Sequence, residues 1–488
     1  MKKYFVFAAM ALATFMNYSC SDVDNPGSPT TDVYYLDGKD YVANVVATFQ
    51  GEVGTEVSLG LGVYDPFDVY AVDFGDGNLV IDSVGWHGGG VREGEGEVPA
   101  EKPGTTHTGI TTFKGTIAGK GIVTVYGNSD LWYASLSGGI APTSFDQQGL
   151  KKVVQFNISG ANMEKVELPQ LEELTQFSFN NSPVKSVDVS KAPNLTSLTI
   201  GNLATSEFDS QLTSIDVSQN TKLESISIAG GVWYNIAVAN FNNKPGKLTK
   251  LDLSKNPAIK TIAVSNNKLT EIILPEDAAI DQLSIDYNEL TSIDLSKIKS
   301  IKNIQAGNNK FKSLDLSKLV AKGTIRVNDN ELTALDIPVD VAHLYAQNNK
   351  IAAFSMKELT NSTPNLQLQN NELTIATLPV KSVKMTTASK LKKYIYSPQA
   401  DMEVTPAGAV VDLSAQAKAK GILAEEVATT FKITAGNAVL VEGTDYNIAD
   451  GKITFLKSVN EALVTMTTTA FPNLTLSTKP FNVTVAAE

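Results

Sequence analysis

The feature that most constrains this chain is a repeat of 21 residues in its middle part. The clearest copies read LTKLDLS, LTEIILP, LTSIDLS, FKSLDLS and LTALDIP, and they begin at Leu248, Leu269, Leu290, Phe311 and Leu332. Weaker copies begin at Met163, Val184, Leu212, Ile351 and Leu373. A fixed period of this length predicts a solenoid, in which each coil buries its apolar side chains against its neighbours.

A second half-repeat of the form L-x-x-L-x-L-x-x-N lies between these copies. The alternation in L-x-L predicts a short strand whose apolar side chains point inward. The LDLS half predicts a second short strand, and the spacing leaves too little room for a long helix. Asparagines close the half-repeats, and their amides can bond to backbone groups that the turn leaves unpaired. We expect six of them to stack as a ladder: Asn267, Asn288, Asn309, Asn330, Asn349 and Asn371.

These residues resemble leucine-rich repeats, closest to the internalin-like kind found in bacterial surface proteins. The resemblance covers roughly residues 160–390 and implies a leucine-rich-repeat solenoid over residues 150–395. It also implies that the x positions around L-x-L face outward on a concave sheet. The spacing departs from the pattern in places, and the longest departure separates Leu212 from Leu248 by 36 residues.

Two small β-sandwich domains, both immunoglobulin-like, are predicted to flank the solenoid, over residues 32–145 and 396–488, which makes the fold class mainly β. The sequence VDFGDG at residues 72–77 resembles the turn of PKD-type immunoglobulin-like domains, where Asp-Gly joins two strands in a hairpin. The acidic, glycine-rich segment 85–104 favours a hairpin loop over a calcium site, because calcium needs about six converging oxygens.

The first residues are typical of a targeting signal. Two lysines and a short apolar run precede the single cysteine, Cys20, and this arrangement resembles a lipoprotein signal peptide over residues 1–19. The resemblance implies lipidation of Cys20, and an ordinary secretory signal with an incidental cysteine is the alternative. Residues 20–31 are predicted to form a flexible tether. The acidic residues directly after Cys20, in Ser21–Asp24, resemble the surface-export signal of Bacteroidota lipoproteins. We therefore expect a lipid anchor in the outer membrane, exposure on the cell surface, and no other membrane contact.

The amino-acid composition excludes several classes of function. The net charge of −12 argues against binding of nucleic acid, and one cysteine excludes a disulfide framework or a cysteine-based zinc site. Three scattered histidines leave little material for a metal cluster or a hydrolase. We therefore expect no metal, no cofactor, no catalysis and a monomer. A glycosidase-like carboxylate pair stays open as an alternative, because the chain has 52 acidic residues.

The outward positions suggest where a ligand binds. They are small in the early repeats and become larger later, and the candidates there are Gln305, Arg326, His343, Tyr345 and Gln367. Tyrosine and arginine are frequent anchors of protein contacts, and the amide groups also suit glycans. In the 36-residue step, Trp233 and Tyr234 form either a projecting contact loop or a cap on the local core. We expect binding of a protein or a glycan on this face, with a solvated polar face on a structural spacer as the alternative.

Overall fold

The computed structural model describes residues 33–36, 39–42, 44–63, 69–83, 110–127, 130–202, 208, 210–229, 245–320, 323–338, 341–356, 365–380, 394–422 and 425–486. Within these residues the chain consists of strands and turns, with helical geometry confined to two 3₁₀ turns at Gln148–Leu150 and Ser414–Gln416. The prediction of a mainly β chain is confirmed.

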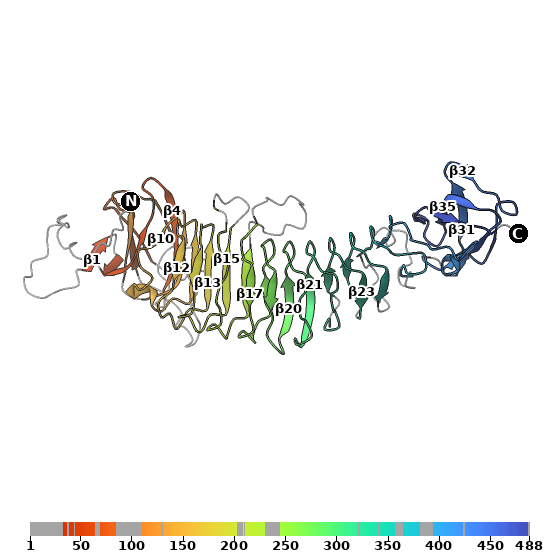
Figure 1. The fold of residues 1–488 in the computed structure, drawn as a ribbon. Coiled ribbons are helices and arrows are strands. Elements are labelled where there is room, and N and C mark those ends of the chain that lie inside the picture. The colour runs from red at the N-terminus through yellow and green to blue at the C-terminus, as the bar shows by residue number, and fades with distance from the viewer. Residues whose placement is uncertain are drawn as a thin grey trace, which may run out of the picture.

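One sheet of 14 strands runs along most of the molecule (Figure 1). From β9 to β27 its neighbouring strands are parallel, so the chain returns to the same side of the molecule after every coil. These strands are β9 (Leu131–Ser137), β11 (Gln155–Ser159), β13 (Gln176–Asn180), β15 (Ser197–Gly201), β16 (Ser225–Ala229), β18 (Thr261–Ala263), β20 (Ala279–Ser284), β21 (Ser300–Gln305), β22 (Thr324–Arg326), β24 (His343–Tyr345), β26 (Asn365–Gln367) and β27 (Tyr394–Ile395).

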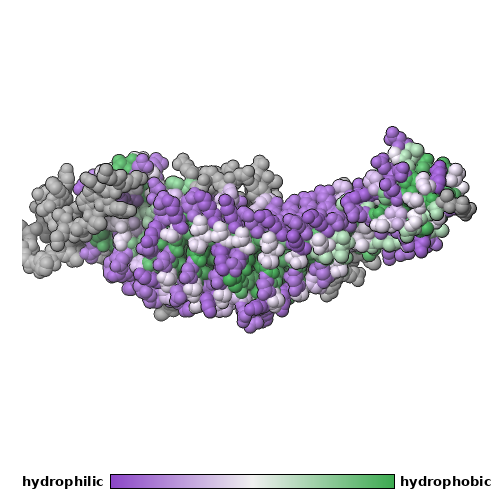
Figure 2. All heavy atoms as spheres, in the orientation of Figure 1, coloured by the Kyte–Doolittle hydropathy of each residue, from purple (hydrophilic) through white to green (hydrophobic). Residues whose placement is uncertain are grey.

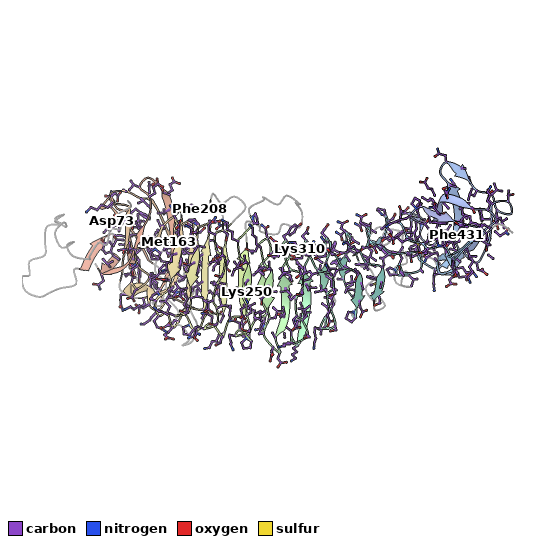
Figure 3. All side chains as sticks on the ribbon, viewed as in Figure 1. Asp73, Met163, Phe208, Lys250, Lys310 and Phe431 are labelled. Atoms are coloured by element: carbon purple, nitrogen blue, oxygen red, sulfur yellow. The ribbon has the colours of Figure 1, made fainter. Side chains whose placement is uncertain are left out.

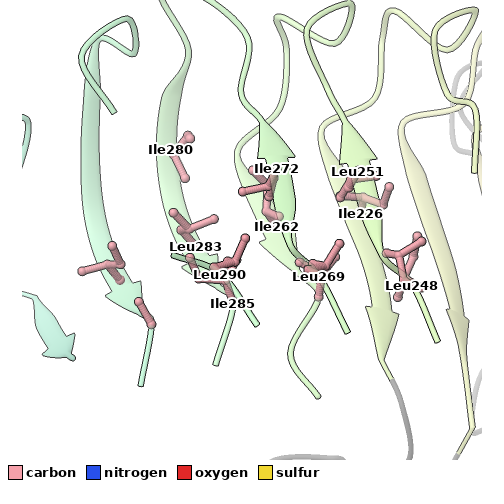
Figure 4. Close-up of a cluster of buried hydrophobic side chains, with 14 of the residues drawn as sticks. Ile226, Leu248, Leu251, Ile262, Leu269, Ile272, Ile280, Leu283, Ile285 and Leu290 are labelled. Carbon is pink, nitrogen blue, oxygen red and sulfur yellow. The ribbon is translucent and has the colours of Figure 1, made fainter. Parts of the chain in front are cut away.

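A second wall closes each coil. It is made by the LDLS-type segments, and three pairs of them form two-stranded parallel sheets where the second strand is predicted. In the copies that begin at Leu290 and Phe311 the predicted second strand does not form. The strands are β12 (Lys165–Glu167), β14 (Ser186–Asp188), β17 (Lys250–Asp252), β19 (Glu271–Ile273), β23 (Ala334–Ile337) and β25 (Ala353–Met356). Apolar side chains from both walls meet inside the coil, as Ile262 and Ile272 do in Figure 4. This shared interior is the reason that no coil is stable without its neighbours.

The main sheet continues across the 36-residue interval between Leu212 and Leu248, which we call the 36-residue step. Strand β16 pairs directly with β18, and Ser225 aligns with Thr261 across the same 36-residue interval that separates Leu212 from Leu248. The sheet hydrogen bonds therefore continue from one side of the step to the other. The repeat thus resumes in register after the longer interval, and the main sheet includes the strands on both sides of it.

The main sheet also continues into the segment before the repeats. Strands β4 (Glu56–Val63) and β7 (Thr111–Thr116) extend it, and β4 pairs antiparallel with β9 so that Ser58 aligns with Ser137. The sheet thus spans the predicted domain boundary at residues 145–150, because β9 before it pairs with β11 after it. Because β4 covers β9, the backbone groups at the edge of the first coil are paired and not left open to solvent.

The region before the repeats also contains a second sheet of five strands. Its order is β10-β3-β8-β5-β6, and its bounds are β3 (Val45–Gln50), β5 (Val69–Asp73), β6 (Leu79–Ser83), β8 (Ile122–Tyr126) and β10 (Ala141–Pro142). A separate hairpin joins β1 (Val33–Leu36) to β2 (Lys39–Val42). The VDFGDG turn lies between β5 and β6, and Asp73 Oδ1 accepts the backbone N–H of Gly75 at 2.7 Å. Gly77 has a φ of 80°, so the predicted hairpin turn is confirmed.

The chain ends in antiparallel sheets. Their strands are β28 (Val410–Asp412), β29 (Lys418–Ala419), β30 (Val427–Ala428), β31 (Thr430–Ala435), β32 (Ala438–Val439), β33 (Tyr446–Ala449), β34 (Lys452–Phe455), β35 (Val459–Thr467), β36 (Thr475–Ser477) and β37 (Phe481–Val483). This C-terminal module lies at the far end of the solenoid in Figure 1.

The module docks on the last coil through a small aromatic cluster. Tyr396 packs edge-on against Tyr394 at 5.0 Å and against Phe471 at 5.3 Å between ring centroids. Its hydroxyl accepts the backbone N–H of Asn473 at 3.4 Å, and Gln416 Oε1 accepts the N–H of Ala376 at 3.0 Å. The apolar interior of the last coil therefore continues into the module.

Polar residues dominate the outside. Figure 2 shows hydrophilic residues over most of the visible solenoid surface. Ion pairs connect neighbouring coils: Lys250 Nζ lies 2.8 Å from Glu271, and Lys310 Nζ lies 2.9 Å from Glu289 (both lysines are labelled in Figure 3). These pairs are exposed, so solvent screens them and they contribute little to stability.

Candidate ligand-binding face

The ladder asparagines sit in the turn that follows each strand of the main sheet. In Asn288, Oδ1 accepts the N–H of Leu269 at 3.0 Å, and Nδ2 donates to the carbonyls of Val264 at 3.1 Å and Ile285 at 3.0 Å. All six asparagines are between 1% and 9% exposed and make equivalent bonds in successive coils: Asn267, Asn288, Asn309, Asn330, Asn349 and Asn371. Each one thus joins two coils through groups that a turn would leave unpaired.

Gln399 ends the ladder with a longer side chain. Its Oε1 accepts the N–H groups of Asn371 and Leu373, both at 3.2 Å. Its Nε2 donates to the carbonyls of Leu368 at 2.9 Å and Tyr396 at 2.6 Å. Gln399 was not predicted, because it lies outside the asparagine repeat.

A second, shorter ladder was also missed. Asn220 and Asn256 follow the LDLS-type half of their coils and are fully buried. Asn256 Nδ2 donates to the carbonyls of Val217 at 3.0 Å and Asn220 at 2.9 Å. The signal was present in the sequence, where both residues stand in an S-x-N turn.

The residue before each ladder asparagine has left-handed backbone geometry. Its φ lies between 54° and 59° in Asn266, Tyr287, Asn308, Asp329, Asn348 and Asn370. Asparagine and aspartate enter this region most readily, which accounts for the composition of the turn. Tyr287 is the exception in this set.

The outward side chains of the main sheet form aligned rows. The strand register places the middle positions in a single line: Ser178, Thr199, Ser227, Ala263, Ser284, Gln305, Arg326, Tyr345 and Gln367. A parallel row includes Asn303 and ends with His343 and Asn365. The five late-repeat candidates from the sequence, Gln305, Arg326, His343, Tyr345 and Gln367, therefore share one surface, which we call the late-repeat face.

Contacts across strands hold the centre of this face in place. The guanidinium carbon of Arg326 lies 4.4 Å from the centre of the Tyr345 ring, which is a cation–π geometry. The Tyr345 hydroxyl accepts a hydrogen bond from Asn365 Nδ2 at 3.1 Å. The His343 ring lies 6.4 Å from the Tyr345 ring. These contacts hold the side chains of Arg326, Tyr345 and Asn365 in a defined arrangement on the face.

Two further glutamines extend the face. Gln347 and Gln369 follow β24 and β26 and continue the outward alternation, and both are partly exposed. Their Oε1 atoms are buried and have no hydrogen-bond partner, and the same holds for Nδ1 of His343. Buried polar atoms are normally paired, and an unpaired one costs about 1–3 kcal/mol. These glutamines were not predicted, because they lie beyond L-x-L, inside the turn.

One buried carboxylate lies near the start of the face. Asp286 is 5% exposed, and its Oδ1 accepts the N–H of Gly307 at 3.0 Å. Burial raises the pKa of Asp286 to about 6, although the Gly307 hydrogen bond and the charge of Arg326 act in the opposite direction. Charge on this face thus comes from a cation stacked on an aromatic ring and a carboxyl that titrates near pH 6.

Several predicted features lie outside the described residues. These are Cys20 with its signal peptide and tether, the 85–104 segment, and the aromatic pair Trp233 and Tyr234. In the part of the chain that the structure describes, no group of three or more His, Cys, Asp or Glu residues comes close enough to hold a metal ion. Over the same residues, no helix has the length and apolar character needed to cross a membrane.

Comparison with known proteins finds similarity only among solved structures, because no family model and no curated protein matches the chain. The functional domain of InlJ from Listeria monocytogenes, which includes a cysteine ladder, is similar over 70% of this chain and 88% of that chain, with 16% identity and a TM-score of 0.31. The leucine-rich repeat domain of APL1 is similar over 52% of this chain and 76% of that chain, with 16% identity and a TM-score of 0.28. These neighbours are leucine-rich-repeat proteins, and the present chain is a β-solenoid whose ladder is built from asparagine.

Proposed function

We infer that this chain is a non-catalytic cell-surface lipoprotein that binds a protein or glycan through its late-repeat face. The observation that carries the inference is the concentration of preorganised and unpaired polar groups on β22, β24 and the turns that follow β24 and β26. Arg326 and Tyr345 are stacked, and His343, Gln347 and Gln369 each hold a buried atom with no partner. The early part of the same rows carries small side chains such as Ser178 and Ala263 in β13 and β18.

Binding assays with point variants test the choice of face. Arg326→Ala and Tyr345→Ala should each weaken binding of ligands found on protein and glycan arrays. Thr199→Ala, in the same row of the early repeats, serves as the matched control and should bind normally. Unchanged binding in both late-repeat variants would exclude this face. If the arrays yield no ligand at all, the structural spacer becomes the better explanation.

The anchor and the location form a separate part of the proposal. They rest on Cys20 directly after a short apolar run, followed by the acidic stretch Ser21–Asp24. Labelled palmitate should enter the protein in cells, and Cys20→Ser should abolish the label. Protease added to intact cells should remove the protein from the surface. Complete protection from protease would contradict surface display without affecting the binding proposal.

The flanking regions fit the same role. The VDFGDG hairpin supports a PKD-type, immunoglobulin-like ancestry for the first region, and both flanking regions are built of antiparallel sheets. Such modules would hold the solenoid away from the membrane at one end and seal its interior at the other. Loss of ligand binding on deletion of a flanking module, with the solenoid still folded, would show that the module itself takes part in binding.

A further inference from the structure

We propose that the late-repeat face binds a neutral, hydroxyl-rich carbohydrate chain that runs across strands β22, β24 and β26. The inference rests on the proposed function and adds the chemical class of the ligand. It is carried by the unpaired groups, the lack of apolar side chains on the face, the local charge and the spacing of the strands.

The unpaired groups require a partner that both donates and accepts. Gln347 and Gln369 occupy equivalent positions just after the neighbouring strands β24 and β26. The N–H of Asn348 donates to the carbonyl of Gln369 at 3.1 Å and extends the strand register into these turns. Both side-chain amides can turn toward the surface, because the last torsion of glutamine is soft. A sugar hydroxyl can satisfy either end of such an amide, and it can likewise pair with His343 whichever ring nitrogen carries the proton.

The composition of the face disfavours a protein partner. Its outward groups are amides, an imidazole, a phenol and a guanidinium, whereas the aliphatic side chains of the same strands, such as Leu344 and Leu366, are buried. The exposed aliphatic residue that follows in register is Ile395, on the terminal strand β27. Stable protein interfaces usually contain an apolar core, and sugars need only an aromatic or aliphatic surface beside their hydroxyl contacts.

The charges favour a neutral ligand. Arg326 stacks on Tyr345 and interacts with the Asp286 carboxylate, so its positive charge is partly balanced within the face. The whole chain carries a net charge of −12, which repels anionic polymers at a distance. An acidic polysaccharide therefore gains less here than a neutral one.

The spacing of the rows matches a sugar chain. Neighbouring strands lie about 4.8 Å apart, so equivalent side chains recur at that interval along the solenoid. An extended chain of pyranose rings repeats at nearly the same distance, which allows one ring per strand. An extended peptide repeats every ~3.3 Å and would fall out of register with the rows within a few residues.

Affinity electrophoresis of the purified protein tests the proposal. Separate gels contain hydroxyethyl cellulose, laminarin, an α-mannan or a galactan, and a polygalacturonate gel serves as the anionic comparison. We expect retardation by at least one neutral polysaccharide and less by polygalacturonate. The double variant with Gln347→Ala and Gln369→Ala should bind about tenfold more weakly or worse. Gln176→Ala, the same change on the early part of the sheet, should bind normally, and circular dichroism should show all variants folded.

The remaining outcomes separate the two proposals. Retardation that the double variant does not change would overturn the carbohydrate site on this face. Failure of every neutral polysaccharide, together with a protein ligand whose binding depends on Arg326 and Tyr345, would overturn the carbohydrate inference and leave the binding face standing. If neither polysaccharides nor proteins bind, both proposals fail.

Discussion

Removal of one ladder asparagine should open the solenoid locally. Asn309 accepts the N–H of Leu290 at 3.1 Å and donates to the carbonyl of Ile285 at 2.9 Å, and both partners belong to the preceding coil. Asn309→Ala leaves the buried N–H of Leu290 without a partner, whereas the carbonyl of Ile285 still accepts a hydrogen bond from Asn288 Nδ2 at 3.0 Å. One unsatisfied buried group costs about 1–3 kcal/mol, and we expect the free energy of unfolding to fall by that amount.

Hydrogen exchange measured by mass spectrometry can locate the loss. In a solenoid each coil interacts only with its neighbours, so exchange should accelerate around Leu290 by at least about tenfold. Peptides from β31 and β35 in the C-terminal module should exchange as before and provide an internal reference. Unchanged protection at Leu290 in Asn309→Ala would refute the view that the ladder joins the coils.

A second substitution at the same position tests the donor specifically. Asn309→Asp keeps the acceptor for Leu290 but turns an oxygen toward the carbonyl of Ile285. The variant should be at least as unstable as Asn309→Ala at pH 7. Its new carboxyl would have a higher pKa in the folded than in the unfolded state, so stability should recover as the pH falls.

Three further predictions concern other parts of the molecule. The pKa of Asp286 is raised from 3.8 to about 6, so the folded state binds the proton more tightly and stability should fall as the pH rises through that interval. Asp286→Asn should remove this pH dependence and raise the free energy of unfolding at pH 7 by up to roughly 3 kcal/mol, as measured by urea unfolding. An unchanged dependence of stability on pH would contradict a raised pKa for Asp286. Tyr396→Ala should release the C-terminal module by removing its packing on Phe471 and increase the radius of gyration in small-angle scattering, whereas Tyr396→Phe should stay compact. Tyr287→Asn should stabilise the protein by about 1 kcal/mol in thermal unfolding, because asparagine accepts the left-handed backbone more readily; a lower melting temperature would show that the Tyr287 contacts outweigh the strain.

Much of the solenoid could be predicted from the sequence because its contacts are local. Each coil touches the coil before and after it, so the 21-residue period specifies both the strand register and the buried positions. The second short strand lies where LDLS predicts it in several coils, for example at Lys250–Asp252, but it does not form in the copies that begin at Leu290 and Phe311. The 36-residue step could be placed for the same reason, since its two flanking strands keep the repeat pattern.

The candidate site was predictable only in part. The rows that contain Gln305, Arg326 and Tyr345 follow from the period, which specifies which positions face outward. The period does not say which polar atoms find partners, because that depends on side-chain geometry across strands. Gln347 and Gln369 therefore emerged only with their neighbours in place.

The sequence by itself determined that the chain coils with a fixed step and which residues enter its interior. Only the tertiary structure decided how that coil begins and ends. At the start, β4 joins the main sheet through pairs such as Ser58 with Ser137, and at the end Gln399 takes the place of an asparagine. Both closures unite segments that share no repeat, and they form because the terminal coils would otherwise leave backbone groups and apolar side chains exposed to water.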